Sequence, residues 1–368
     1  MTVLITGSEG FIGSNLTKRL DFLKIDYLSF TKSNSIEELV SMIEGCDCII
    51  HLAGTNRSPD DSKFVEVNVN LTSKIVKTLL TSGNKRKKIL FASSTKADED
   101  SIYGKTKRKA EDLISSLDAN QNVAYQNLRL PNIFGKWCKP DYNSVVATFM
   151  FRIQRNLPIT ISNPATKVEL LYIDNLIDFL VSSIQAPIEL ILEFKPRVSK
   201  ISLQELYAKC KYFNENLPIA NVGMGLDRQL YATFLSYKDK EKFTTLLSPN
   251  YDDRGSFTEI MKTVNSGQFS FFTAKPGITR GGHYHNSKNE KFLVVQGCAL
   301  FRFKNIKTGE IHKIETTSSE PILVETIPGW AHDITNIGRD TLIVFLWANE
   351  IFDIENPDTF SYSLEEKV

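Results

Sequence analysis

This 368-residue sequence has no strong excess of charge and no long apolar run. Its 44 basic and 43 acidic residues leave a formal net charge of +1, so there is no long-range attraction for nucleic acid or for an anionic membrane. No apolar run approaches the roughly 18 residues of a membrane helix, and no signal peptide precedes the strand expected at Thr2. We therefore expect a cytoplasmic protein that binds neither nucleic acid nor membranes.

Cysteine is scarce, and its pattern excludes two classes of protein. The five cysteines are an odd number and form no CxxC pair, which argues against a disulfide framework and against a thiolate metal site. Apolar residues make up 42% and charged residues 24%, as in ordinary globular proteins, so a mostly disordered chain is excluded. The length favours two domains.

The first half of the sequence alternates strand and helix patterns. We expect strands at 2–6, 27–30, 47–52, 88–92 and 123–130, and helices at 11–23, 36–43, 68–80 and 105–117. Repeated strand–helix units predict an α/β Rossmann-like domain, with a parallel sheet covered on both faces. Four basic residues (85–88) precede the apolar part of the fourth strand, and we interpret them as a solvated loop.

Three glycines follow the first strand directly and open the first helix. Gly7 permits a tight turn, Gly10 lets the backbone approach a pyrophosphate, and Gly13 allows close helix–strand packing. The helix N-terminus then offers free N–H groups to phosphates. This pattern predicts a dinucleotide site.

The end of the second strand indicates which dinucleotide is bound. An NAD site places an acidic residue there to bind the ribose 2′-hydroxyl. The sequence instead has Thr31, Lys32 and Ser33, whose hydroxyls and ammonium suit a 2′-phosphate. We therefore favour NADPH over NADH, with a merely solvated Lys32 as the alternative.

Tyr103 and Lys107 lie four positions apart at the start of a helix, so both point to one face. An ammonium group favours the phenolate and would lower the pKa of the tyrosine. Hydroxyls that could polarise a carbonyl end the preceding strand, at Ser93, Ser94 and Thr95. The combination predicts a reductase with Tyr103 as acid.

These motifs resemble the extended short-chain dehydrogenase/reductase family, in its nucleotide-sugar-modifying members. The matching segments are TGSEGFIGSNL (6–16), DCIIHLAGTN (47–56), Asn68, FASST (91–95), YGKTK (103–107), RLPNIFG (129–135) and YIDNL (172–176). The resemblance implies that Tyr103 donates the proton, Lys107 binds the nicotinamide ribose and Ser94 binds the carbonyl. The implied cofactor-binding residues are Gly7, Gly10, Phe11, Ile12, Gly13, Thr31, Lys32, Leu52, Ala53, Gly54, Tyr103, Lys107 and Asn132.

Two departures from this family's pattern stand out. Nine positions separate Ser94 from Tyr103, which is short for the family, so Ser93 and Thr95 stay open as alternatives to Ser94. The stretch between the second and fourth family strands is also short, so we expect the regular third strand to be missing.

From about Leu246 the pattern changes to short apolar stretches. They lie at 257–261, 269–273, 292–295, 300–303, 322–327 and 342–347, separated by Gly, Asn, Pro and Ser. This pattern is typical of an antiparallel β-sandwich or barrel. We therefore expect a reductase domain at 1–245 and an all-β domain at 246–368.

Most histidines of the second domain fall in one pattern. His283 and His285 are two apart on an expected strand, so their side chains share a face, and Glu290 and His332 would come from neighbouring strands. Three imidazoles and a carboxylate suit zinc, manganese, iron or nickel, and zinc is our working choice. We expect His51 to be structural and His312 to be exposed on a hairpin.

This half resembles the cupin superfamily, a double-stranded β-helix or jelly roll. The segments DDRGSF (252–257) and PG-x2-H (328–332) are similar to sugar-nucleotide 3,5-epimerases, and the two-domain order resembles a bacterial capsule and O-antigen enzyme family. That resemblance implies a role in UDP-N-acetyl-L-fucosamine synthesis and a homodimer. The cupin would epimerise C3 of UDP-2-acetamido-2,6-dideoxy-4-hexulose. The reductase would then reduce C4 to give UDP-2-acetamido-2,6-dideoxy-L-talose.

Several alternatives stay open at this point. Tyr284, Lys291, Asp253 and His312 are all candidates for the epimerase base. The metal can be structural or catalytic. Two rival functions are a keto-sugar reductase with a non-catalytic cupin and a regulatory protein that senses NADP(H).

Overall fold

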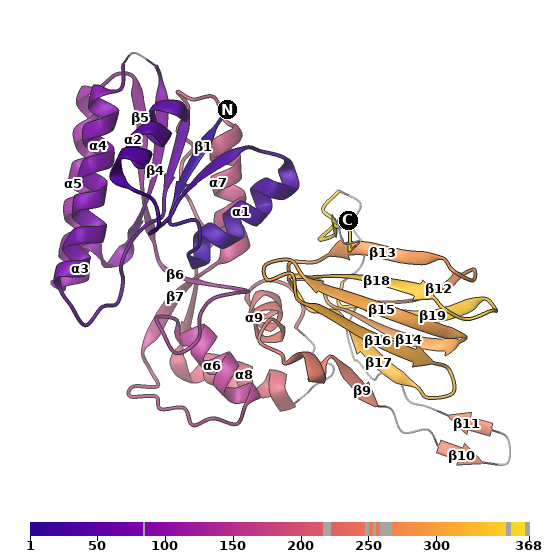
Figure 1. Ribbon diagram of the computed structural model, residues 1–368. Helices are drawn as coiled ribbons and strands as arrows, with labels where there is room; N and C mark the ends of the chain where they lie inside the picture. The colour runs from indigo at the N-terminus through magenta and orange to yellow at the C-terminus, as the bar shows by residue number, and fades with distance from the viewer. Residues whose placement is uncertain are drawn as a thin grey trace. The chain divides into compact units, whose positions relative to one another are not determined.

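The computed structural model describes residues 1–83, 85–215, 222–246, 250–252, 255–257, 267–350 and 355–364 (Figure 1). The chain forms two compact units. The N-terminal unit comprises 1–134, 138–145 and 167–201, and the C-terminal unit comprises 135–137, 146–166 and 202–368.

The N-terminal unit is built on a five-stranded parallel sheet in the order β2-β1-β3-β4-β5. Its strands are β1 (Val3–Thr6), β2 (Tyr27–Phe30), β3 (Cys48–His51), β4 (Lys87–Ser94) and β5 (Val123–Leu130). The helices of this unit are α1 (Phe11–Leu23), α2 (Ile36–Gly45), α3 (Ser62–Phe64), α4 (Leu71–Thr81), α5 (Ile102–Ser115) and α7 (Ile173–Gln185). Figure 1 shows helices on both sides of the sheet, as the alternating pattern predicted.

The five strands and the first two helices agree with the sequence expectations to within two residues at most ends. The helix expected at 68–80 is instead a π-helical turn, η1 (Val65–Asn70), followed by α4, and α5 begins three residues earlier than expected. In the described part of the chain no strand pairs with the outer edge of β2, which agrees with the expected loss of one strand.

The basic residues at 85–88 are not all solvated, contrary to our interpretation. Lys87 and Lys88 are the first residues of β4 and are only 2% and 1% exposed. Each ammonium group reaches the end of a helix, where main-chain carbonyl groups lack partners within the helix. Charge composition alone could not separate these two lysines from the exposed Lys85 and Arg86.

A smaller sheet has the order β6-β7-β8, with β6 (Asn132–Phe134) parallel to β7 (Lys167–Tyr172) and with β8 (Ser199–Ser202) at its edge. The helical part of the C-terminal unit contains α6 (Val145–Gln154), α8 (Leu203–Glu215) and α9 (Leu226–Leu235). Within the described ranges, no helix combines the length and apolar character needed to span a bilayer.

The rest of the C-terminal unit is an all-β sandwich of two five-stranded antiparallel sheets, which is the cupin fold that the sequence predicted. One sheet has the order β12-β19-β14-β17-β9, with β12 (Gln268–Ala274), β19 (Leu342–Ala348), β14 (Glu290–Gln296), β17 (Ile322–Glu325) and β9 (Thr244–Leu246). The other has the order β16-β15-β18-β13-β20, with β16 (Ile311–Thr317), β15 (Cys298–Asn305), β18 (Trp330–Asn336), β13 (Thr279–Tyr284) and β20 (Phe360–Ser361). A hairpin of β10 (Asn250–Asp252) and β11 (Gly255–Phe257) precedes them.

Five strands of this sandwich coincide with none of the expected apolar stretches: β9, β13, β16, β18 and β20. The spacing of the histidines alone indicated strands around His283 and His332. A histidine in each of β13 and β18, together with the two glycines of β13, interrupts the apolar alternation on which a strand prediction rests. The expected strand at 257–261 lies mostly outside the described residues. His312 lies on the hairpin of β15 and β16, as expected, but it is half-buried rather than exposed and contacts the Phe243 ring edge-on at 5.7 Å.

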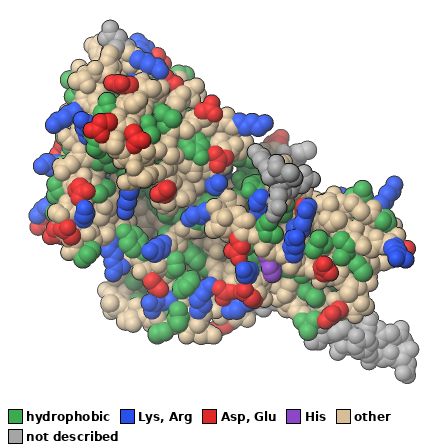
Figure 2. All heavy atoms as spheres, in the orientation of Figure 1, with side chains coloured by type: hydrophobic (Ala, Val, Ile, Leu, Met, Phe, Trp, Pro, Cys, Tyr) green, Lys and Arg blue, Asp and Glu red, His purple; other side chains and the backbone are tan. Residues whose placement is uncertain are grey.

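The expected boundary at 245 falls inside β9, which pairs with β17. Phe243, just before it, is 1% exposed and belongs to the sandwich core. Figure 2 shows basic and acidic side chains interspersed over the visible face of each unit, as the near-zero net charge predicts.

Candidate functional site

The glycine turn of the N-terminal unit has the geometry of a phosphate-binding loop. Gly7 has φ +71°, and a Cβ there would lie 2.8 Å from the main-chain nitrogen of Ala53. A Cβ at Gly13 would lie 2.3 Å from the Gly7 carbonyl oxygen, so only glycine allows α1 to approach this closely. Gly10 is the N-cap of α1, and no described side chain caps the helix, so its first N–H groups are free for a phosphate.

The remaining expected cofactor residues lie around this turn or at strand ends. Phe11 and Ile12 form the first turn of α1, and Thr31 and Lys32 follow β2, where Lys32 is exposed. Leu52 and Ala53 follow β3, and their N–H groups donate to the carbonyl and hydroxyl oxygens of Thr6 at 3.1 Å each.

His51 is structural, as the sequence analysis expected. The Thr72 hydroxyl donates to the Asn68 carbonyl, so His51 Nε2–H donates to Thr72 Oγ1 at 2.9 Å. His51 Nδ1 then accepts from the Thr6 hydroxyl at 2.7 Å. Burial, together with the charge of Lys107, lowers the pKa of His51 to about 3, so this imidazole stays neutral.

Tyr103 and Ser94 meet at the carboxyl end of β4. Burial raises the pKa of Tyr103, and a hydrogen bond with the Ser94 hydroxyl opposes that rise. Of the three alternative hydroxyls, Thr95 donates instead to the Leu130 carbonyl at 3.5 Å, and Ser93 Oγ has no partner among the described residues. Ser94 is therefore the hydroxyl that the fold brings to Tyr103.

Lys107 lies on α5, one turn after Tyr103, and is 5% exposed. Its ammonium donates to the Ala92 carbonyl at 2.8 Å and lies 4.8 Å from the centre of the Phe91 ring. Burial lowers the pKa of Lys107 to about 8, although Glu111 opposes this. The expected lowering of the Tyr103 pKa by Lys107 is not observed, because the burial of the phenol dominates.

Asn68 is a residue of this site to which the sequence analysis assigned no role. It lies on the π-helical turn η1, is 1% exposed, and its amide bonds both main-chain groups of Thr55 and the Thr106 hydroxyl. A Cβ at Gly54 would lie 3.1 Å from Lys107 Nζ and 3.3 Å from Asn68 Oδ1. Asn68 therefore holds the loop after β3 against the face of α5 that carries Lys107.

Asn132 lies in β6, outside the main sheet. Its side chain is exposed and donates to the Glu169 carbonyl at 3.1 Å. Its expected place near the nicotinamide stays a prediction.

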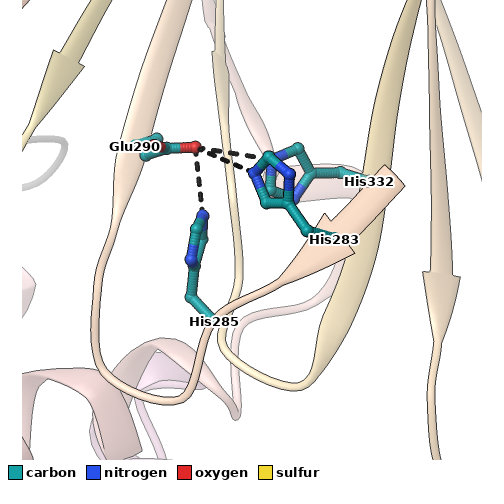
Figure 3. Close-up of side chains that lie close together, drawn as sticks. All are labelled: His283, His285, Glu290 and His332. Carbon is teal, nitrogen blue, oxygen red and sulfur yellow. Dashed lines mark hydrogen bonds and ion pairs between the residues drawn. The ribbon is translucent and has the colours of Figure 1, made fainter. Parts of the chain in front are cut away.

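In the C-terminal unit, His283, His285, Glu290 and His332 converge as predicted (Figure 3). Their ligand atoms all lie within 4.8 Å of one another. Glu290 Oε2 is 3.1 Å from His285 Nε2, 3.4 Å from His332 Nε2 and 4.0 Å from His283 Nε2. Donors around a tetrahedral zinc ion are separated by about 3.4 Å, so this spacing fits one ion.

The protonation of this quartet also fits a cation. His285 Nδ1 lies 2.5 Å from the Asp358 carbonyl oxygen, which can only accept, so Nδ1 carries the proton. In the neutral ring, the Nε2 lone pair then faces a carboxylate oxygen, an arrangement that needs a cation between them. His332 is 1% exposed and has no well-aligned hydrogen bond on either ring nitrogen.

Electrostatics point the same way. Burial lowers the pKa of His332 to about 4, which keeps the ring neutral as a metal ligand must be. Burial raises the pKa of Glu290, but the three imidazoles around its carboxylate together hold it well below its usual range. His283 is the most exposed ligand, with 25% of its side chain accessible, so the quartet meets solvent on that side.

The four candidate epimerase bases lie in different surroundings. Tyr284 is 5% exposed and stacks on Phe360, and Lys291 is fully buried in an ion pair with Glu325. His312 lies on β16, and Asp253 lies outside the described residues. This geometry therefore does not select one of the three described candidates as the base.

Comparisons with known proteins agree with both units. Residues 3–190 match the NAD dependent epimerase/dehydratase family, and residues 250–360 match the polysaccharide biosynthesis C-terminal domain. The chain is 42% identical over its full length, and over the full length of the relative, to a UDP-2-acetamido-2,6-beta-L-arabino-hexul-4-ose reductase of Pseudomonas aeruginosa. It is 25% identical to a Vibrio cholerae UDP-glucose 4-epimerase, over 50% of this chain and 67% of that one.

Among solved structures, the chain is similar to the capsular polysaccharide assembling protein CapF from Staphylococcus aureus. The identity is 34%, the TM-score is 0.64, and the match covers 99% of this chain and 100% of that one. Both units of the chain, with the glycine turn and the His/Glu quartet, lie within these two matches. The chain belongs to the NAD dependent epimerase/dehydratase family, among members that carry a polysaccharide biosynthesis C-terminal domain.

Proposed function

We propose that the chain is a bifunctional nucleotide-sugar enzyme. Its cupin epimerises C3 of UDP-2-acetamido-2,6-dideoxy-4-hexulose, and its N-terminal unit reduces the C4 ketone with NADPH. The product would be UDP-2-acetamido-2,6-dideoxy-L-talose, a precursor of UDP-N-acetyl-L-fucosamine for capsule or O-antigen synthesis. The full-length relative named as a UDP-hexulose reductase supports this substrate class.

The single observation that carries the reductase assignment is the grouping of Tyr103, Ser94 and Lys107 at the carboxyl end of β4. Because burial raises the pKa of Tyr103, the phenol stays protonated near neutral pH and can donate its proton to the C4 oxygen. The Ser94 hydroxyl orients the phenol and can bond the same oxygen. When bound, NADPH supplies the hydride to C4.

The residues of the glycine turn would hold the cofactor. Free N–H groups at the start of α1 suit the pyrophosphate, and the exposed Lys32 with the hydroxyls of Thr31 and Ser33 suits a ribose 2′-phosphate. Lys107 would bind the nicotinamide ribose.

The cupin reaction depends on the same ketone. A C4 carbonyl acidifies the C3 proton, so a base can remove that proton and return one on the opposite face. His283, His285, Glu290 and His332 would hold a divalent ion, with zinc as our choice, and a bound ion supplies positive charge for a developing enolate oxygen. Reduction at C4 removes the ketone and ends the exchange, so epimerisation must come first.

We test this with the full chain and the UDP-4-keto sugar in deuterated water. Without NADPH, deuterium should enter C3, as followed by NMR and mass spectrometry. Tyr103→Phe should abolish NADPH oxidation and leave this exchange intact. Tyr27→Phe, which removes only an exposed hydroxyl that donates to Asp21, is the matched control and should keep both activities.

The outcomes separate the alternatives. NADPH oxidation without C3 exchange would favour a keto-sugar reductase whose cupin is not catalytic. NADPH oxidation by Tyr103→Phe would remove Tyr103 as the acid. Absence of both activities with keto-sugars would favour a regulatory protein.

A further inference from the structure

A short segment near the chain end lies beside the metal-ligand quartet. β20 pairs with β13, so that Ser361 is opposite His283 and Phe360 is opposite Tyr284. This register brings the two preceding residues, Asp358 and Thr359, alongside His285 and the loop that follows it. Neither residue had been assigned a role from the sequence.

Asp358 makes two kinds of contact with this region. Its main-chain carbonyl accepts the His285 Nδ1–H at 2.5 Å, which sets the tautomer and the ring orientation of that ligand. Its carboxylate accepts three successive main-chain N–H groups of the loop after His285: Asn286 at 2.9 Å, Ser287 at 2.6 Å and Lys288 at 2.6 Å. The Ser287 hydroxyl adds a fourth bond at 2.8 Å.

Those loop residues connect one metal ligand, His285, to the next, Glu290. A carboxylate that holds three consecutive N–H groups fixes the path of the loop, and thereby the distance between both ligands. The main-chain carbonyl of Asp358 also accepts the hydrogen bond of the His285 imidazole, so one residue positions both the loop and the ring.

Thr359 extends this support to Glu290. Its hydroxyl accepts from Lys288 Nζ at 2.9 Å, and the same ammonium lies 3.4 Å from Glu290 Oε1. The other carboxylate oxygen, Oε2, faces the three imidazoles. Lys288 therefore engages one oxygen and leaves the other for an ion.

Arg228 of α9 also contacts the 286–288 loop and Asp358. It donates to the Ser287 hydroxyl at 2.7 Å, pairs with Glu350 and lies 3.7 Å from Asp358 Oδ2. The Asp358 side chain is 14% exposed, so these contacts are largely shielded from water.

We propose that Asp358 is the positioning residue of the cupin metal centre, which holds His285 and the 286–288 loop in the ligating geometry. This inference rests on the proposed metal site. Outer partners of this kind typically change metal affinity by about 10–100-fold when they are lost. The metal ligands themselves are intact in an Asp358 variant.

The experiment measures zinc affinity of the chelator-stripped full chain by competition with a chromophoric chelator. Asp358→Ala should bind zinc about 10–100-fold more weakly than wild type, and Asp358→Asn, which keeps one acceptor oxygen, should fall between them. Cobalt is then added to saturation, and its visible absorption bands report the ligand geometry. Both variants should show altered bands, which a role in folding alone would not produce.

Asp340→Ala is the matched control, because Asp340 is an exposed aspartate of the same unit. It should keep the wild-type affinity and cobalt spectrum. Circular dichroism verifies that each variant is folded. If Asp358→Ala does not fold, Asp358→Asn alone tests the inference. Wild-type zinc affinity or an unchanged cobalt spectrum in folded Asp358→Asn would overturn this inference alone. Absence of metal binding by wild type would overturn the proposed metal site with it.

Discussion

At the residue scale, the buried ammonium group of Lys107 in the candidate reductase site lowers the stability of the folded protein. The ammonium is buried, donates to the Ala92 carbonyl and lies over the Phe91 ring. Glu111, one turn further along α5, is bound by Arg129 through two hydrogen bonds of 2.9 and 2.7 Å. Burial therefore outweighs the attraction of Glu111 and lowers the pKa of Lys107 to about 8.

We predict that Lys107 makes stability depend on alkaline pH. Between about pH 8 and its ordinary pKa of 10.5, the unfolded chain keeps a proton that the native state releases, so stability rises with pH. Wild type should gain up to about 3 kcal/mol relative to Lys107→Met across this window. Urea unfolding at pH 7 and pH 10 measures this difference.

Lys105→Met is the control for that experiment, because Lys105 forms only a surface pair with Asp100. Its free energy of unfolding should follow wild type at both values of pH. A constant difference between wild type and Lys107→Met would contradict the lowered pKa.

At the element scale, the first two residues of β4 connect the sheet to helices on its two faces. Successive strand residues point to opposite faces, so Lys87 reaches the end of α2 and Lys88 the end of α7. Lys87 Nζ donates to carbonyls 43, 44 and 46 at 2.8, 3.1 and 2.6 Å. Lys88 Nζ donates to carbonyls 183, 186 and 187 at 3.0, 3.3 and 2.8 Å. Each cation also complements the negative end of its helix dipole.

We predict that Lys87→Met and Lys88→Met each destabilise the N-terminal unit by about 2–3 kcal/mol, because buried carbonyls lose a charged donor. Lys85→Met removes only a surface pair with Asp47, and should change stability by less than about 0.5 kcal/mol. Urea unfolding followed by NADPH fluorescence compares the three. Equal effects of all three substitutions would argue that the helix ends do not depend on these lysines.

At the scale of the whole molecule, the near-zero net charge leaves association to local surfaces. β12 is an edge strand of its sheet, and its outward face carries Phe269 and Phe271, which are 54% and 64% exposed. Both rings contact Phe345 of β19, at 5.5 and 6.1 Å. An apolar edge of this kind is normally covered by a partner, and the homodimer that we expect from the resemblance supplies one.

We predict that the chain is a dimer and that Phe269→Ser with Phe271→Ser shifts it toward monomer. Light scattering after size-exclusion chromatography should give twice the chain mass for wild type. Ile337→Ser, which replaces an exposed apolar residue of the same unit, should leave the mass unchanged. A monomeric wild type, or a double variant that stays dimeric, would remove this face as the interface.

Local patterns in the sequence by themselves determined the Rossmann-like sheet, the glycine turn and the His/Glu quartet. Apolar periodicity reports buried strands and helices directly, and motifs such as 283–290 place their ligands within a few residues of one another. The tertiary structure decided what depends on distant contacts. Lys87 and Lys88 are distinguished from Lys85 only by the carbonyls of α2 and α7.

The same holds for the support of the quartet. Asp358 lies 73 residues from His285, and only the pairing of β20 with β13 brings them together. β13 and β18 were expected only from the spacing of their histidines, because polar side chains face the interior of the sandwich where strand patterns require apolar residues. Polar side chains that face the interior for a chemical reason break the hydrophobic pattern of their strand. Their contacts are difficult to predict from the sequence, because those contacts come from strands far away in the chain.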